Sequence, residues 1–245
     1  PVKKFNDIGM FDDSGIAQQI STGILQIENE LYDIVRPKRS GPSGSRPASL
    51  LKTGGIEYLE LRGIDVNPFI PEGIDVSKIK LLDIYITHSL ISESPLISDK
   101  EIEEIKANQK IMVSEGRSKN IMLSKNGDLV SLDELRKIFL AELEQTAEAL
   151  DEYSEGYLKA FHLETNNNML QSEKILAEMD VKGFEFQEYA LNQSKKIAEN
   201  FDSSDISDFY ALTNSAQASI ENLRNLEESS SMDINKYVEL YNSKI

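Results

Sequence analysis

The chain has 245 residues, a formal net charge of −16 at pH 7, no Cys and no Trp. This length allows one large domain or two small ones with a sizeable buried core. The lack of Cys excludes a disulfide framework, a Cys-based zinc site and a Cys nucleophile. The acidic charge argues against DNA or an anionic membrane as a partner. No apolar run approaches the length of a membrane span, and no signal peptide follows Pro1, so we expect a part of a longer cytoplasmic protein.

The first predicted strand covers residues 25–32, where apolar and polar residues alternate. Successive side chains of a strand point to opposite faces. The face shared by Gln26, Glu28, Glu30 and Tyr32 is polar, and such a face is either exposed to water or lines a wet pocket.

Residues 40–49 form a loop rich in Gly, Ser and Pro, which we expect to be mobile. The segment is locally basic, with Arg36, Lys38, Arg39 and Arg46 in or beside it. One interpretation is a clamp over nucleotide phosphates, and another is a flexible surface loop. The spacing of its Gly and Lys residues does not match a Walker loop.

The second predicted strand, residues 56–62, places Glu60 and Arg62 two positions apart on one face. A carboxylate is the natural protein ligand of Mg²⁺. A guanidinium binds phosphate or carboxylate oxygens through paired donors. The pair therefore suits a site that holds both a cation and an anion, although an ion pair on a solvated face would have the same spacing.

Helical spacing dominates after residue 75, so the sequence predicts an α+β fold with strands first and helices after. Asp75 is the expected N-cap of a helix to Ser92, and Ser98 with Glu101 has the pattern of a capping box. Further signals are a helix end at Gly116, a turn at Asn126-Gly127-Asp128, a second capping box at Ser131 and Glu134, and helices onward to residue 241. The two His residues, His88 and His162, lie far apart and do not support a His-centred metal site or triad.

Several of these segments together resemble the proteobacterial type of glutamate–cysteine ligase, also called γ-glutamylcysteine synthetase. The resemblance is strong over about residues 24–69 and weaker to about residue 200. It is carried by Leu25 to Tyr32, Arg36-Pro37-Lys38-Arg39, Gly54 to Arg62, Asp65-x-Asn67-Pro68-Phe69 and, more weakly, Asn108, Glu115-Gly116-Arg117 and Ser172-x-x-Ile175-Leu176-x-x-Met179. It covers only the C-terminal half of that family, whose N-terminal half carries most of the metal-binding carboxylates.

The resemblance implies a ligase that joins L-glutamate to L-cysteine through a γ-glutamyl phosphate, the first step of glutathione biosynthesis. It implies ATP as co-substrate and Mg²⁺ as cofactor, with Mn²⁺ as a substitute. Glu60 would be a metal ligand, Arg62 a catalytic and substrate-binding cation, and Tyr32 part of the wall that receives cysteine. Arg36, Lys38 and Arg39 are the candidate nucleotide-binding residues.

The resemblance also implies a funnel-like antiparallel sheet related to that of glutamine synthetase. Residues 1–75 would form a portion of this sheet within the catalytic domain, and residues 76–245 a helical region packed around it. Without the missing half, we expect the chain to be inactive.

Two other classes of function remain open from the sequence. A phosphagen-kinase-like enzyme would also need Mg–ATP, but it would usually carry a reactive Cys. A non-catalytic acidic helical interaction module would account for the charge of the helices and leave the polar strand faces unexplained.

Overall fold

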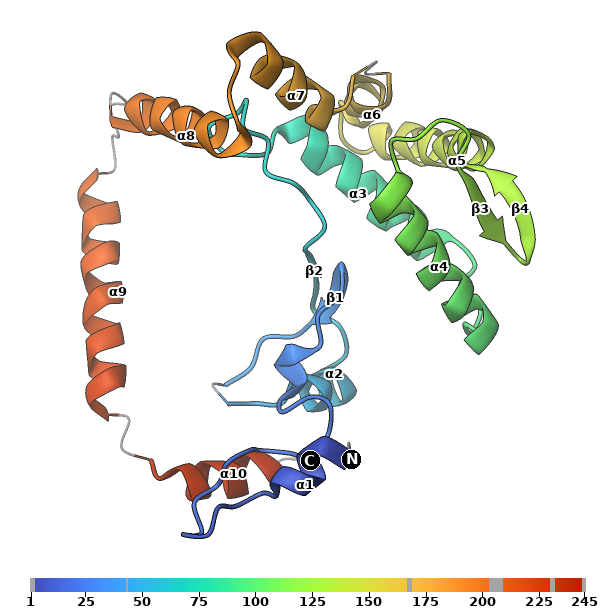
Figure 1. Ribbon diagram of the computed structural model, residues 1–245. Coiled ribbons are helices and arrows are strands. Elements are labelled where there is room, and N and C mark those ends of the chain that lie inside the picture. The colour runs from blue at the N-terminus through green and yellow to red at the C-terminus, as the bar shows by residue number, and fades with distance from the viewer. Residues whose placement is uncertain (1–2, 43, 167–168, 203–208, 230–231, 244–245) are drawn as a thin grey trace. The chain divides into compact units, whose positions relative to one another are not determined.

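The computed structural model describes residues 3–42, 44–166, 169–202, 209–229 and 232–243 (Figure 1). Within them, helices and two antiparallel two-stranded sheets form an α+β fold, which confirms the predicted fold class. The elements are α1 (Lys3–Ile8), η1 (Glu28–Glu30), β1 (Val35–Lys38), α2 (Pro47–Gly54), β2 (Tyr58–Leu61), α3 (Val76–Ile91), α4 (Asp99–Glu115), β3 (Met122–Lys125), β4 (Asp128–Ser131), α5 (Leu132–Asp151), α6 (Tyr157–Thr165), α7 (Gln171–Lys182), α8 (Phe186–Asp202), α9 (Phe209–Ser229) and α10 (Ile234–Asn242).

The chain divides into two compact units, residues 1–65 with 204–245, and residues 66–203. In the first unit β1 pairs with β2, and the strand predicted at residues 56–62 is confirmed over Tyr58–Leu61. The strand predicted at residues 25–32 is wrong, because that segment contains the short 3₁₀ helix η1.

The polar side chains of this segment explain the error, because they bind nearby backbone groups instead of lining a strand face. Gln26 Oε1 accepts hydrogen bonds from the N–H groups of Ile20 and Ser21, at 2.8 and 3.2 Å. Glu28 Oε2 accepts one from the N–H of Ala48 at 2.8 Å. Side-chain bonds of this kind compete with a regular ladder.

The C-terminal helix α10 packs against the N-terminal segment of the same unit (Figure 1). Asn235 makes two bonds to that segment: its Oδ1 accepts from the N–H of Ala17 at 2.7 Å, and its Nδ2 donates to the carbonyl of Gly15 at 2.8 Å. Val238 and Tyr241 are buried on the same helix. The two ends of the sequence therefore stabilise one another.

The second unit has a core between α3, α5 and α6, built on Ile84, Leu143, Ala147 and Phe161. The predicted helix starts are confirmed at α3 and α4: the Asp75 side chain accepts from the N–H of Lys78, and Ser98 with Glu101 forms both halves of a capping box. At α5, Ser131 accepts from the N–H of Glu134 at 3.2 Å. No helix in the described part of the chain is both long and apolar enough to cross a membrane.

The second sheet was not predicted. The Asn126-Gly127 turn that the sequence indicates joins β3 to β4, and both residues have positive φ, 58° and 89°. Such a pair favours a tight hairpin turn. The hairpin is held to α4 by Glu104, whose carboxylate accepts from the hydroxyl of Ser124 and the N–H groups of Asn126 and Gly127.

Candidate functional site

The charged face of the β1–β2 ribbon carries the strongest candidate site. Directly opposed residues of an antiparallel pair share a face, and the register opposes Arg36 to Glu60 and Lys38 to Tyr58. Lys38 Nζ lies 3.0 Å from Glu60 Oε2. Arg62 approaches the other oxygen, Oε1, with Nη2 at 2.8 Å and Nε at 3.0 Å. One carboxylate is therefore held between two cations.

These contacts determine the charge of Glu60. Its contact with Lys38 and then that with Arg62 hold the pKa of the Glu60 carboxyl below its usual value. The side chains of Glu60 and Arg62 each remain about one third exposed, at 33% and 34%. The carboxylate stays ionised at neutral pH while the pair remains accessible to a ligand.

Tyr32 joins the same group, although it does not lie on a strand. The guanidinium carbon of Arg62 lies 4.9 Å from the centre of the Tyr32 ring, in cation–π geometry. The Tyr32 side chain is 72% exposed, so most of the ring is free to contact a ligand. We refer to Tyr32, Lys38, Glu60 and Arg62 as the Glu60 cluster.

The structure does not bring the three candidate nucleotide-binding cations together. Lys38 contacts Glu60, whereas Arg36 donates to the carbonyl of Asn29 at 3.4 Å. Arg39 donates to the carbonyl of Gly55 at 3.2 Å, and its side chain fills the space where a Cβ at Gly54 would lie. Side-chain alternation places Arg39 on the face opposite to that of Lys38.

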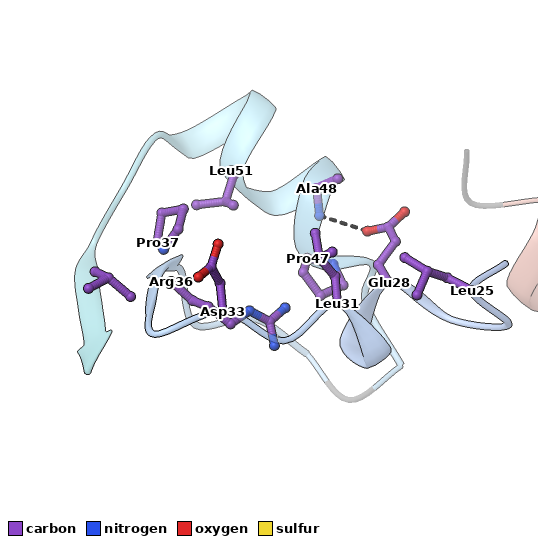
Figure 2. Close-up of a pocket in the computed structure, with 10 residues that line it drawn as sticks. Leu25, Glu28, Leu31, Asp33, Arg36, Pro37, Pro47, Ala48 and Leu51 are labelled. Atoms are coloured by element: carbon purple, nitrogen blue, oxygen red, sulfur yellow. Dashed lines mark hydrogen bonds between the residues drawn. The ribbon is translucent and has the colours of Figure 1, made fainter. Parts of the chain in front are cut away.

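An apolar cavity of about 280 Å³ lies beside the ribbon in the same unit (Figure 2). Its lining comes from η1, β1, α2 and the residues near them: Leu25, Glu28, Leu31, Asp33, Val35, Arg36, Pro37, Pro47, Ala48 and Leu51. Only Arg36 belongs to the predicted site residues. Every second residue from Leu31 to Pro37 lines the cavity, whereas Tyr32 contacts Arg62 instead. This alternation is the signal in the sequence that could have indicated a second surface here.

Glu28 fixes one wall of this cavity. Its Oε1 accepts from Arg46 Nε at 2.7 Å, and its Oε2 accepts from the N–H of Ala48, the bond drawn in Figure 2. Residues 47–49, which the sequence assigns to a mobile loop, instead begin α2 with Pro47 in the first turn. The basic residue Arg46 therefore holds the loop to Glu28.

Comparison with known proteins assigns the family. A family model described as glutamate-cysteine ligase matches residues 1–112. Glutamate–cysteine ligase of Pseudomonas fluorescens is 32% identical over 253 positions, which cover 100% of this chain and 47% of that protein. The protein of the same name from Buchnera aphidicola is 39% identical over 64% of this chain and 31% of its own length. The chain belongs to the glutamate–cysteine ligase family.

The chain spans about half the length of the curated relatives that it matches. A solved glutamate–cysteine ligase from Francisella tularensis, in complex with AMP, has the same fold as this chain with a TM-score of 0.84. The similarity covers 98% of this chain and 49% of that one, at 24% identity.

The described residues of this family member do not by themselves fit a Mg²⁺ site. They contain no group of three or more His, Cys, Asp or Glu side chains that could hold a metal ion. Mg²⁺ prefers octahedral coordination by oxygen ligands. Glu60 could offer one carboxylate, and both of its oxygens already contact a cation.

Proposed function

We propose that this chain is part of an ATP-dependent ligase that joins the γ-carboxylate of L-glutamate to the amine of L-cysteine through a γ-glutamyl phosphate. The single observation that carries the proposal is the Glu60 cluster, in a chain whose relatives are glutamate–cysteine ligases. The Francisella enzyme was solved in complex with AMP, which supports a nucleotide as one of the proposed substrates.

The chemistry of the cluster suits this reaction. Phosphoryl transfer to a carboxylate and attack of an amine on the acyl phosphate both concentrate negative charge on oxygen atoms. The guanidinium of Arg62 is fixed on one side by Glu60 and on another by the Tyr32 ring, so its remaining N–H groups are oriented before a ligand arrives. We assign Arg62 to the transferred phosphoryl group or the glutamate carboxylate.

Tyr32 and Lys38 extend this assignment. The exposed ring of Tyr32 offers an apolar surface and a hydroxyl group beside Arg62, which suits the acceptor amino acid L-cysteine. Lys38 is proposed to contact the nucleotide from this face, and Arg36 and Arg39 are proposed to do so only from separate positions, because the structure does not bring the three together. Glu60 is proposed as a single ligand of Mg²⁺, and the other ligands would come from outside the described residues.

The cytoplasmic location expected from the sequence stays a prediction.

The test is reconstitution. The purified chain is assayed alone and together with a polypeptide that supplies the remaining half of a relative, and ADP and γ-glutamylcysteine are measured. We expect product only from the mixture and only with glutamate, cysteine and ATP all present. Steady product formation by the chain alone would contradict the proposed incompleteness of its site.

The same assay distinguishes the other two classes of function. ADP release with a guanidine substrate would favour the phosphagen-kinase-like alternative. Association of the two polypeptides without any ATP-dependent turnover would favour a non-catalytic interaction module.

A further inference from the structure

A second cavity, of about 190 Å³, lies within the unit formed by residues 66–203 and is not used by the proposed ligase site. The loop before α3, the first turns of α3 and α7, and side chains of α5 and α6 enclose it. Its lining includes Phe69, Asp75, Arg136, Glu164, Leu170 and Lys174.

Hydrogen bonds between its elements build this cavity. Gln171 Nε2, at the start of α7, donates to the carbonyl of Val66 at 2.9 Å. Ser77 Oγ donates to Glu164 Oε1 at 2.6 Å, and Lys78 Nζ contacts the other oxygen of the same carboxylate. The first turns of α3 and α7 are thereby tied to α6 and to the preceding loop.

Both carboxylates of the cavity already have partners. Asp75 accepts from the hydroxyl of Ser77 at 2.6 Å and from the N–H of Lys78 at 2.7 Å, while Glu164 is held by Ser77 and Lys78. By contrast, the side chains of Arg136 and Lys174 form no hydrogen bond or ion pair with any residue that the structure describes. The cavity thus carries three cations against two carboxylates, and Arg136 and Lys174 are the two cations without a partner among the described residues, in a chain whose net charge is −16.

The first turn of α7 also borders the cavity, and its acidic residue Glu173 accepts from the N–H of Leu170 at 2.8 Å and pairs with Arg117. The N-cap residue of α7 is Leu170, whose side chain cannot accept a hydrogen bond from the first N–H groups of the helix. Beside these donors lie the exposed apolar side chains of Phe69, Met169 and Leu170, which are 38%, 44% and 56% exposed. Cations and apolar groups therefore share one small opening.

We propose that this cavity binds a small phosphate monoester. A monoester carries about −1.5 to −2 charges at neutral pH, which matches the two unpaired cations. Arg136 supplies the planar fork of donors that fits phosphate oxygens, and Lys174 supplies a point charge. Phe69, Met169 and Leu170 contact the organic part of the ligand. A carboxylate has only a single charge to share between the two unpartnered cations.

The test uses the chain as it exists, with phenyl phosphate, inorganic phosphate and benzoate as probes at constant ionic strength. Binding is followed through the backbone amide NMR signals of residues 170–174. We expect saturable shifts there with phenyl phosphate, weaker ones with inorganic phosphate and none with benzoate. Equal shifts with benzoate would overturn the assignment to a phosphate, and no saturable shift with any probe would overturn the site itself.

Arg136→Met and Lys174→Met should each weaken phenyl phosphate binding by about tenfold, the scale of one hydrogen bond to a charged group. Lys137→Met is the matched control, because it removes the same charge at the next position of α5, from a side chain that does not line the cavity. An equal loss of binding in the control would show that the probe responds only to the overall charge of the surface, and it would contradict the proposal.

Arg36→Met keeps the cavity intact and should leave the shifts at residues 170–174 unchanged. Probe-induced shifts confined to β1 and β2 would overturn this inference while leaving the proposed ligase function in place. Conversely, failure of the reconstituted ligase assay would not affect binding by the isolated chain.

Discussion

Arg62 and Glu60 meet through two nitrogen atoms and one oxygen, with Nη2 2.8 Å and Nε 3.0 Å from the same Oε1. Lys38 contacts the other oxygen, so the negative charge of Glu60 would still have a cationic partner without Arg62. The proposed role of Arg62 toward a ligand depends on its planar fork, which Lys cannot reproduce, whereas charge balance alone does not.

The first prediction concerns Arg62→Lys in the reconstituted ligase. Lys keeps the charge but loses the paired donors, and we expect kcat to fall by on the order of 10²-fold, the scale for one transition-state donor. The measurement is kcat with all substrates saturating, beside a thermal melt of the variant. A near-normal kcat in a variant that melts normally would remove Arg62 from the catalytic residues.

Glu60→Gln tests the proposed metal ligand. The amide keeps the shape of the side chain and loses the charge, so the reconstituted enzyme should need a higher Mg²⁺ concentration for half-maximal activity. Glu57→Gln is the control on the same segment, because Glu57 Oε2 only accepts from the N–H of Ser40, at 2.8 Å. An unchanged Mg²⁺ dependence in Glu60→Gln would assign Glu60 to an ordinary ion pair.

Tyr32 gives a prediction about substrate preference. Tyr32→Ala removes the ring that faces the Arg62 guanidinium, and we expect the KM for cysteine to rise more than the KM for ATP. Tyr32→Phe keeps the ring and should retain most of the affinity if the ring, rather than the hydroxyl, contacts cysteine. A parallel rise in KM for glutamate, cysteine and ATP would instead indicate a general disturbance of the cluster.

The sequence predicted those parts of the fold that depend on local signals. Strand β2 follows from simple alternation, and the starts of α3 and α4 follow from Asp75 and from Ser98 with Glu101, because a cap depends on residues three positions apart. The strand predicted at residues 25–32 failed for the opposite reason. Glu28 is bound to Arg46 and Ala48, whose positions no local pattern specifies.

For the candidate site too, the sequence predicted only the contact that depends on local spacing. The two-residue spacing of Glu60 and Arg62 places them together on any strand. The contact of Lys38 with Glu60 depends on the register of β1 with β2, and the contact of Tyr32 with Arg62 joins β2 to a residue that lies before β1, outside either strand. Bonds between α10 and residues 15–20 join positions more than 200 apart in the sequence, and no local pattern indicates them.

Asp75 predicts a pH dependence of stability. The hydroxyl of Ser77 and then the N–H of Lys78 lower the pKa of the Asp75 carboxyl. A carboxyl whose folded pKa lies below its unfolded value, about 3.9, stabilises the fold above that value and loses this contribution as the pH falls through the folded pKa. Acidification from pH 5 toward the lowered pKa should therefore reduce the stability of the native chain.

Two variants isolate this effect. Asp75→Ala should cost about 1 kcal/mol at neutral pH, the usual cost of losing an N-cap. Asp75→Asn keeps a capping oxygen without a charge that titrates, so its stability relative to the native chain should improve as the pH falls. Denaturant unfolding at pH 3 and pH 7 measures both, with Asp83→Asn on the exposed side of α3 as control. A difference between Asp75→Asn and the native chain that does not change with pH would contradict the prediction.

The last prediction concerns Tyr241, which anchors α10 to the segment that forms one wall of the apolar cavity. Its side chain is only 8% exposed, its hydroxyl accepts from the N–H of Glu28 at 3.3 Å, and the Arg46 guanidinium lies 4.9 Å from its ring. Removing a buried aromatic side chain leaves a void and loses these contacts, so Tyr241→Ala should destabilise the first unit by about 3 kcal/mol.

Tyr241→Phe keeps the ring and its contact with Arg46 and loses only the long hydrogen bond, so its cost should be about 1 kcal/mol or less. Tyr153→Ala is the control, because Tyr153 is 88% exposed and its loss should change stability by no more than about 0.5 kcal/mol. Denaturant unfolding measures all three variants, and amide hydrogen exchange at residues 28–48 reports where the protection is lost. If Tyr241→Ala leaves protection at residues 28–48 unchanged, then α10 does not hold that wall, and the buried ring stabilises only its own helix.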